Sequence, residues 1–273
     1  MTDFKAWAAD DAARHIRIPD ESDDKYSRGV LGVITGSDQY PGAAVLGVEA
    51  ALRTGVGMVR YLGGERVSSL VLQRRPEAVA SEGRVQAWLI GSGTDHANRE
   101  DAAHALAAVA IAQALPTVLD GGALELHDGA TGPVVITPHY GELARVLGVP
   151  KDDIVADPAV WAVRASEELG VTVLLKGHRS YVAGGGVALV AASAPNWLAT
   201  AGAGDALAGI LGALVATHTA EIASVETTLA RLAASAAVIH GLAAHRASAG
   251  GPLTILDLAE AVPGTIAGLL RHG

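Results

Sequence analysis

Residues 196–204 are rich in small side chains and lead directly into Asp205 and the apolar segment 206–216. This pattern predicts a helix that begins near Gly204 and carries one carboxylate in its first turn. The unpaired N–H groups at a helix start bind anions, and glycines let a phosphate approach the backbone closely. A carboxylate beside that phosphate can take a proton from a hydroxyl, so Asp205 is a candidate general base. It could equally be a simple helix-capping acid.

Four further clusters of polar residues and glycines each follow an apolar, strand-like run. They are residues 36–44, 91–93, 137–142 and 176–180. Because ligands in open α/β sheets bind outside the carboxyl ends of the strands, we expect these clusters to converge at that edge. Lys176 is a candidate cation for nucleotide phosphates, with the residues after it wrapped around the nucleotide. The structural alternative is a solvated lysine at the end of a strand.

Other polar residues also have both a functional and a structural interpretation. His139 lies in a Thr-Pro-His-x-Gly-Glu turn, where a histidine is more often structural than catalytic. Glu142 could hold Mg²⁺, directly or through water, or supply charge to the first turn of a helix. Asp120 ends a strand and could orient water or Mg²⁺, or cap a turn. His240 and His245 are five residues apart, which is the wrong spacing for one helical face, so we interpret both as structural.

The composition excludes several classes of protein. The chain has 273 residues, a formal net charge of −9 and no basic stripe, which argues against nucleic-acid binding. It has no cysteine, which removes disulfides, thiolate nucleophiles and cysteine metal sites. No Gly-x-x-x-x-Gly-Lys-Ser/Thr, His-Glu-x-x-His or glycine-rich dinucleotide motif occurs. Apolar runs such as 206–216 are too short to span a bilayer, and residues 1–25 lack a signal-peptide core. We therefore expect a cytoplasmic protein that binds neither nucleic acid nor membranes.

Strand-like and helical segments alternate along the chain, which predicts an α/β fold with a mostly parallel sheet covered on both faces. We expect a single domain over residues 1–273, with residues 1–25 as an N-terminal arm. The expected strands are 30–34, 58–62, 78–81, 87–90, 117–119, 134–137 and 171–176, followed by a hairpin of 181–183 and 187–190. The expected helices are 6–16, 43–54, 67–72, 100–114, 141–147, 158–169, 204–217, 225–245 and 256–262.

With these motifs in place, the chain resembles the ADP/ATP-dependent NAD(P)H-hydrate dehydratases of the ribokinase-like superfamily. The resemblance runs from about residue 25 to the C-terminus. It implies a ribokinase-like three-layer α/β/α fold with a central, mostly parallel sheet. The matching segments are 25–29, 36–44, 53–57, 120–124, 137–142, 176–177 and 196–209.

The resemblance implies a hydro-lyase that restores NADH or NADPH from the hydrates NADHX and NADPHX, in the S configuration at C6. ADP, or ATP, and Mg²⁺ are the expected co-substrate and cofactor. The C6 hydroxyl is phosphorylated and phosphate is eliminated, so that ADP gives AMP and phosphate. The resemblance further implies a homo-oligomer, dimeric or tetrameric, and a functional pairing with an NAD(P)HX epimerase. That partner is sometimes fused at the N-terminus, and residues 1–25 are too few to be that domain.

By the same resemblance, Asp205 is the catalytic base, and the hydrate contacts Asp205, Ala43, Gly93 and His139. Glu142 is the candidate ligand of Mg²⁺, directly or through water. The nucleotide is expected to contact Lys176, Gly177, His178, Arg179, Ser180, Ala203 and Gly204.

The chain departs from the usual family pattern at Ser92 and Tyr140, where proline is frequent, at Ala203 and Ser180, where threonine is frequent, and at Trp197.

Two other functions stay open. One is a ribokinase-like kinase for the hydroxymethyl group of a vitamin precursor. The other is a nucleotide-sensing protein without turnover. A kinase leaves a stable phosphorylated product, whereas a dehydratase releases inorganic phosphate.

Overall fold

A nine-stranded sheet runs through the computed structural model, which describes residues 3–94 and 101–272. The strand order is β1-β9-β8-β7-β6-β5-β4-β2-β3, and only β8 runs antiparallel to its neighbours. The mostly parallel sheet and the β8–β9 hairpin are therefore as predicted. The strands are β1 (Lys5–Ala6), β2 (Val30–Ile34), β3 (Met58–Tyr61), β4 (Ala87–Ile90), β5 (Thr117–Leu119), β6 (Val134–Ile136), β7 (Thr172–Leu175), β8 (Ser180–Gly184) and β9 (Val187–Ala191).

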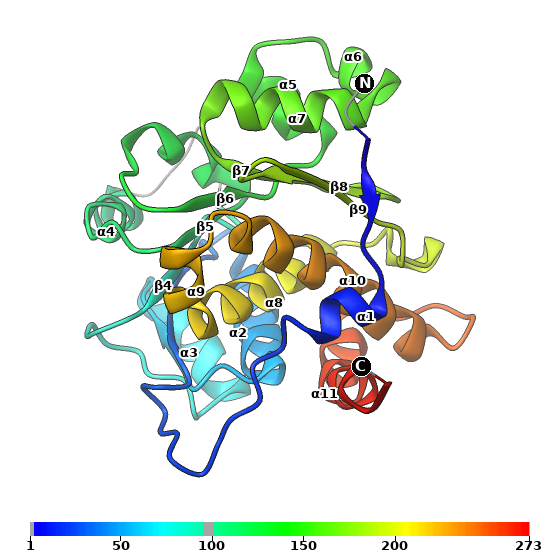
Figure 1. The fold of residues 1–273 in the computed structure, drawn as a ribbon. Coiled ribbons are helices and arrows are strands. Elements are labelled where there is room, and N and C mark those ends of the chain that lie inside the picture. The colour runs from blue at the N-terminus through cyan, green and yellow to red at the C-terminus, as the bar shows by residue number, and fades with distance from the viewer. Residues whose placement is uncertain (1–2, 95–100, 273) are drawn as a thin grey trace.

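Helices cover both faces of this sheet (Figure 1). Successive side chains of a strand point to opposite faces, so Leu31 and Leu89 join one buried cluster while Val30 and Trp88 join the other. The first face carries α1 (Ala9–Ala13), α2 (Pro41–Thr54), α3 (Glu65–Arg74), α8 (Ala203–Thr217), α9 (Thr219–Ser224), α10 (Thr228–Ser248) and α11 (Ile255–His272). The second carries α4 (Asp101–Ile111), the 3₁₀ helix η1 (Gly121–Gly129), α5 (Tyr140–Leu147), α6 (Lys151–Ala156) and α7 (Pro158–Leu169).

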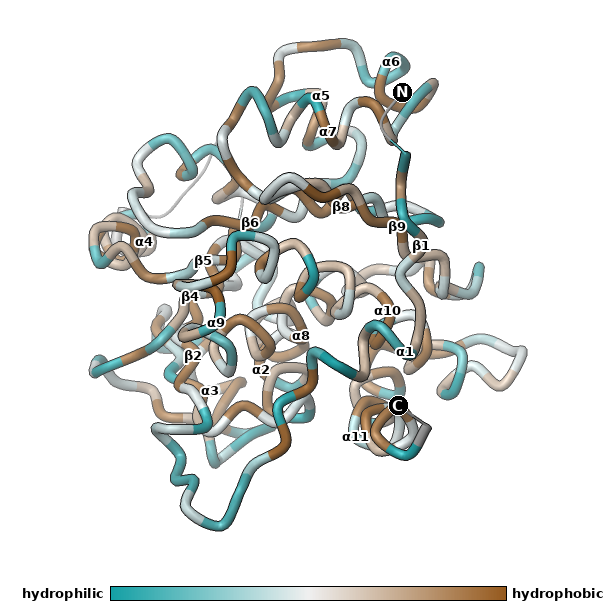
Figure 2. The backbone as a smooth tube through the Cα atoms, in the orientation of Figure 1, coloured by the Kyte–Doolittle hydropathy of each residue, from teal (hydrophilic) through white to brown (hydrophobic). Residues whose placement is uncertain are grey.

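The apolar character of the chain follows this layering. Figure 2 shows hydrophobic colour along the central strands and hydrophilic colour on many outer loops. α8 is buried from Ala206 to Ala216 because it lies between the sheet and the outer helices of its face. None of the described helices combines the length and the apolar character needed to cross a bilayer.

Several helix ends lie where local sequence signals place them. α5 stops at Gly148 and α7 at Gly170, both in the left-handed conformation that ends helices. α7 also begins with Pro158 in its first turn, where the missing N–H costs no hydrogen bond.

Other expected elements were wrong in extent. Residues 78–81 form no strand, since Val79 makes only a single bridge to Arg60. The helix expected over 6–16 covers only Ala9–Ala13, and Lys5–Ala6 instead pair with β9 at the sheet edge. The indole of Trp7 donates to Ser235 Oγ at 3.0 Å, which fixes this segment on α10. Such long-range pairing has no local signal in the sequence.

Boundaries also moved among the helices. The helix expected over 225–245 starts only at Thr228 and runs to Ser248, and residues 225–227 connect it to α9. α11 continues far beyond residue 262, with Pro263 inside it. α6 and η1 were not expected. The first residue of the helix expected over 100–114 lies outside the described residues, and α4 ends at Ile111.

Candidate functional site

The start of α8 has the form that the sequence predicts. α8 begins at Ala203, and Gly202 precedes it in a left-handed conformation without a side-chain cap. The first amides of the helix are therefore free of a capping side chain and carry the positive end of the helix dipole. Asp205 is the acidic residue of this first turn.

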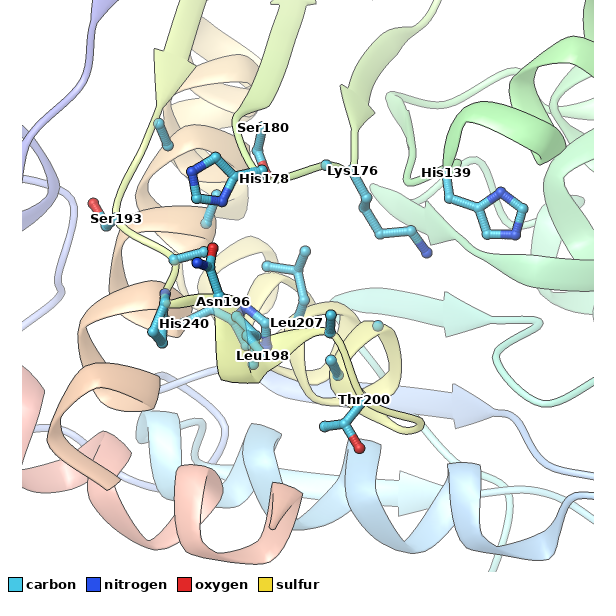
Figure 3. A pocket seen from close by; sticks show the side chains of 18 of the residues that line it. His139, Lys176, His178, Ser180, Ser193, Asn196, Leu198, Thr200, Leu207 and His240 are labelled. Carbon is cyan, nitrogen blue, oxygen red and sulfur yellow. The ribbon is translucent and has the colours of Figure 1, made fainter. Parts of the chain in front are cut away.

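A cavity of about 800 Å³ opens at this helix start, along the carboxyl edge of the sheet. Figure 3 shows Lys176 between His139 on one side and His178 on the other. The exposed side chain of Arg179 and the half-buried Asp205 are not among its lining residues. The expected site residues that line it are His139, Lys176, Gly177, His178, Ser180, Ala203 and Gly204.

Lys176 occupies the centre of this site. Its Nζ lies 2.7 Å from Oδ1 of Asp120 and 3.9 Å from Oε2 of Glu142. Burial acts to lower the pKa of Lys176, but the carboxylates of Asp120 and Glu142 outweigh it and raise the pKa. The lysine therefore carries its positive charge at neutral pH and is not the solvated strand-end residue of the structural alternative.

Asp120 is buried and takes part in a hydrogen-bond network. Its Oδ2 accepts from the Ser92 hydroxyl at 2.8 Å, and its Oδ1 accepts from Thr137 and Lys176, both at 2.7 Å. Burial acts to raise the pKa of Asp120, but Lys176 and the two hydroxyls hold it below the usual value. Its side chain does not cap η1. The turn cap is therefore wrong, and Asp120 is the counter-ion of Lys176. Its role as a ligand of water or Mg²⁺ stays a prediction.

The ionisation of Asp205 is shifted in the opposite direction. Burial is the main cause that raises its pKa to about 6, and the negative charge of Asp120 adds to this effect. The positive charge of Lys176 opposes the shift. A carboxylate whose pKa lies close to neutral pH is well suited to accept a proton during a reaction.

Ala43 and Gly93 lie against each other on the α2 side of α8. A Cβ on Gly93 would stand 2.3 Å from the Cβ of Ala43, so only glycine fits there. Ala43 and Gly47 share one face of α2 because they are four residues apart. A Cβ on Gly47 would lie 3.5 Å from the carbonyl oxygen of Asp205. This face of α2 therefore brings Ala43 and Gly93 close to the start of α8.

His139 and Glu142 form the first turn of α5. His139 Nδ1 accepts from the Glu142 amide at 3.1 Å, and the His139 amide donates to Glu142 Oε2 at 2.7 Å. With Nδ1 as an acceptor, neutral His139 carries its proton on Nε2. The ends of β6 and β7 bring His139 beside Lys176, whose amide donates to the Pro138 carbonyl at 2.8 Å. Within residues 3–94 and 101–272, no group of three or more His, Cys, Asp or Glu could hold a metal.

His240, which we interpreted as structural, belongs to the cavity wall. It comes from α10 and is 6% exposed, and Figure 3 labels it among the residues that line the cavity. Burial lowers its pKa to about 4, so the ring is neutral, and its Nε2 has no hydrogen-bond partner in the described chain. Asn196 and Leu207, from the segment 196–209, and Ser193 also line the cavity, although no role was assigned to them. No local motif marks Ser193.

Known proteins share both the sequence pattern and the fold. A family model described as NAD(P)H-hydrate dehydratase matches residues 31–262. The chain is 41% identical over 229 residues to the bifunctional NAD(P)H-hydrate repair enzyme Nnr of Mycobacterium tuberculosis, covering 79% of this chain and 46% of that enzyme. It thus spans about half the length of that relative. It is 34% identical to the ADP-dependent (S)-NAD(P)H-hydrate dehydratase of Xanthomonas campestris, covering 75% of this chain and 78% of that protein.

A solved structure adds the fold. The ADP/ATP-dependent NAD(P)H-hydrate dehydratase from Bacillus subtilis, co-crystallized with ATP/Mg²⁺, matches with a TM-score of 0.86 at 24% identity. The match covers 98% of this chain and 100% of that one, which confirms the expected ribokinase-like α/β/α fold. Taken with the family model, these matches show that the chain belongs to the NAD(P)H-hydrate dehydratase family.

Proposed function

We propose that this protein catalyses the ADP-dependent dehydration of (6S)-NADHX and NADPHX to NADH and NADPH. The observation that carries the proposal is Asp205, with a pKa of about 6, in the first turn of an uncapped helix. The two residues before it line a cavity together with the charged Lys176. The name of the Xanthomonas campestris relative, an ADP-dependent (S)-NAD(P)H-hydrate dehydratase, supports the same reaction.

The nucleotide occupies the cavity with its phosphates at the start of α8. The amides of the first helical turn carry a partial positive charge, and Lys176 adds a full one beside them. Both bind phosphate oxygens, the amides as directed donors and the lysine as a point charge. Gly177, His178, Arg179 and Ser180 follow Lys176 along the loop toward β8, and we assign them to the remainder of the nucleotide.

The hydrate lies on the other side of Lys176. We assign Ala43 and Gly93 to the nicotinamide ring, because the closely packed backbone at Gly93 carries no side chain that would obstruct the ring. His139, with its proton on Nε2, supplies a hydrogen-bond donor to a polar group of the hydrate. Asp205 contributes the carboxylate nearest to the phosphate-binding amides.

The reaction then balances in two stages. Asp205 takes the proton of the C6 hydroxyl while that oxygen forms a bond to the terminal phosphorus of ADP, and the bond from phosphorus to the AMP oxygen breaks. The ring nitrogen lone pair next expels phosphate from C6. The departing phosphate takes the proton that C5 loses, which restores the dihydronicotinamide. Lys176 and the α8 amides stabilise the charge that develops on the transferring phosphoryl group.

Magnesium fits this site through few protein ligands. Mg²⁺ in phosphoryl-transfer enzymes is usually held by one or two carboxylates together with the substrate phosphates and water. Glu142 meets that requirement, since only its Oε2 accepts a backbone amide and its side chain is 19% exposed. When bound, the ion neutralises phosphate charge.

The proposed partners follow from the reaction. They are NADHX or NADPHX, ADP, and an NAD(P)HX epimerase that supplies the S form of the hydrate. The word "bifunctional" in the name of the Mycobacterium tuberculosis enzyme supports a second repair activity in that relative. A homo-oligomer, dimeric or tetrameric, is part of the proposal, and light scattering coupled to size-exclusion chromatography measures it.

The test mixes the protein with NADHX, Mg²⁺ and either ADP or ATP, and follows absorbance at the reduced-nicotinamide band. We expect absorbance to recover, with one phosphate released for each NADH formed. A parallel assay with hydroxymethyl vitamin precursors tests the kinase alternative. A stable phosphorylated product without recovery of NADH absorbance would contradict the dehydratase.

A further inference from the structure

Asp120 has no role in the reaction proposed for this site. Its carboxylate accepts three hydrogen bonds, from Ser92, Thr137 and Lys176, and the residue is only 4% exposed. Two of the donors are neutral hydroxyls that come from the ends of two other strand segments. Both oxygens of this buried carboxylate accept hydrogen bonds, and its direct contact with the charged groups of the site is the ion pair with Lys176.

The Lys176 ammonium needs a negatively charged partner in its position at the start of α8. A Cβ on Gly204 would lie 3.3 Å from Nζ, so the ammonium group stands directly against the first turn of α8. The amino end of a helix carries a partial positive charge, which disfavours a cation there. A fixed negative charge 2.7 Å from Nζ offsets that repulsion and holds the long side chain in one place.

Glu142 is the other carboxylate near this lysine, and it is less suited to the task. Its Oε2 is 3.9 Å from Nζ and already accepts the His139 amide at 2.7 Å. Asp120 is both closer and held from two sides by Ser92 and Thr137. The geometry therefore favours Asp120 as the group that fixes the lysine.

We propose that Asp120 is a positioning residue that holds the Lys176 ammonium at the start of α8, so that lysine and helix amides bind the nucleotide phosphates together. The inference rests on the proposed function in one respect, the assignment of the nucleotide to this cavity. Ser92 belongs to the same device, because its hydroxyl donates to the Asp120 oxygen that Lys176 leaves free.

A double-mutant cycle on ADP affinity tests this inference, with isothermal titration calorimetry as the measurement. We expect Asp120→Asn to weaken ADP binding by about tenfold or more in the wild-type background. In the Lys176→Met background the same substitution should change affinity by less than about twofold, because no ammonium remains to be positioned. Equal losses in both backgrounds would overturn the proposal.

Asp128→Asn is the matched control. Asp128 lies in η1, its side chain is 88% exposed, and the substitution changes the net charge by the same amount. It should leave ADP affinity unchanged. Circular dichroism checks that each variant folds. If Asp120→Asn does not fold, Thr137→Val and Ser92→Ala replace it in the double-mutant cycle with Lys176→Met. Each removes one donor to Asp120, and each should weaken ADP binding about two- to fivefold only when Lys176 is present.

A kinetic readout separates positioning from general damage. The variants should raise KM for ADP while KM for the hydrate stays within about twofold, since Ala43 and Gly93 are untouched. A rise in both constants by the same factor would contradict a specific effect on Lys176. If the wild type binds ADP but does not turn over NADHX, the proposed function fails while the calorimetric cycle still decides the role of Asp120. Absence of ADP and ATP binding to the wild type would overturn the inference itself.

Discussion

The ammonium of Lys176 stands 3.3 Å from the point that a Cβ on Gly204 would occupy. Lys176 follows β7 and Gly204 lies in the first turn of α8, so a strand end and a helix start meet at this point. The missing side chain at residue 204 is what allows the cation and the helix amides to face the same volume. This contact joins the two features that the sequence indicated separately as phosphate ligands.

Gly204→Ala should weaken nucleotide binding because the new methyl group displaces the ammonium by a few tenths of an ångström or more. We expect ADP affinity to fall by about three- to tenfold, in the range of coupling between directly contacting groups. Calorimetric titration with ADP measures the effect. Gly268→Ala on α11 is the control, because its Cβ meets only Arg271 at 4.0 Å. An unchanged affinity for Gly204→Ala would show that Lys176 does not need this position.

Asp205→Asn should remove the base while keeping the shape of the helix start. We expect turnover of the hydrate to fall by about 10²–10⁴-fold, the usual contribution of a general base. ADP affinity should change by less than about threefold, since the amides and Lys176 remain. Asp152→Asn, an exposed first-turn aspartate of α6, is the control and should retain full turnover. Near-normal turnover of Asp205→Asn would exclude Asp205 as the base.

The pH dependence of the reaction should reflect the same carboxylate. Its pKa is raised to about 6, so the base is protonated and inactive below that pH and ionised above it. We expect kcat/KM for the hydrate to rise with pH up to about 6 and then level off. Steady-state rates between pH 4.5 and 8 measure this limb. A limb centred near pH 4, the ordinary range of an aspartate, would contradict the buried environment of Asp205.

Asp205 should also affect stability, with a definite sign. Because its folded pKa lies above its unfolded value, its contribution to stability is complete below about pH 4 and is lost as pH rises through about 6. At pH 8 the wild type therefore keeps a poorly solvated charge that Asp205→Asn removes. We expect a higher melting temperature for Asp205→Asn at pH 8 and no increase at pH 4. Thermal unfolding at the two pH values measures the difference, and the opposite order would contradict the assigned shift.

A buried carboxylate outside the site should dominate acid stability. Glu49 of α2 is 0% exposed and pairs with Arg53 at 2.7 Å, Arg74 at 3.1 Å and Arg75. Burial acts to raise its pKa, but the three arginines outweigh it and lower the pKa. Its contribution to stability is therefore present above the ordinary pKa of a glutamate and is lost as pH falls through the lowered value.

Glu49→Gln should lower the free energy of unfolding at pH 7 by about 3–5 kcal/mol, since it leaves three guanidinium groups without their shared partner. The deficit should shrink in acid, where the wild type also loses the charge. Urea unfolding at pH 7 and pH 3 measures it. Glu260→Gln is the control, because Glu260 contacts Arg74 but is 54% exposed in its side chain, and exposed pairs contribute less than about 1 kcal/mol. Equal losses for both variants would contradict the role of burial.

The local part of the fold could be read from the sequence. The apolar runs of β2, β4 and β5, the glycine stops at Gly148 and Gly170, and the start of α8 all depend on neighbouring residues. The expected parallel strands place their polar ends at one edge, so the proximity of His139 and Lys176 could also be predicted. The position of β1 at the sheet edge could not be predicted, because its pairing with β9 joins residues far apart in the chain.

The sequence by itself therefore determined most of the strands and helices in their order, and the carboxylate at the start of α8, since periodicity and end signals act over a few residues. Only the tertiary structure decided that Asp120 partners Lys176, 56 residues away, and that His240 lines the cavity at the start of α8. The raised pKa of Asp205 also belongs to the folded state, because it arises from burial and from the charge of Asp120. Contacts of this kind depend on how whole layers pack, and no short motif encodes them.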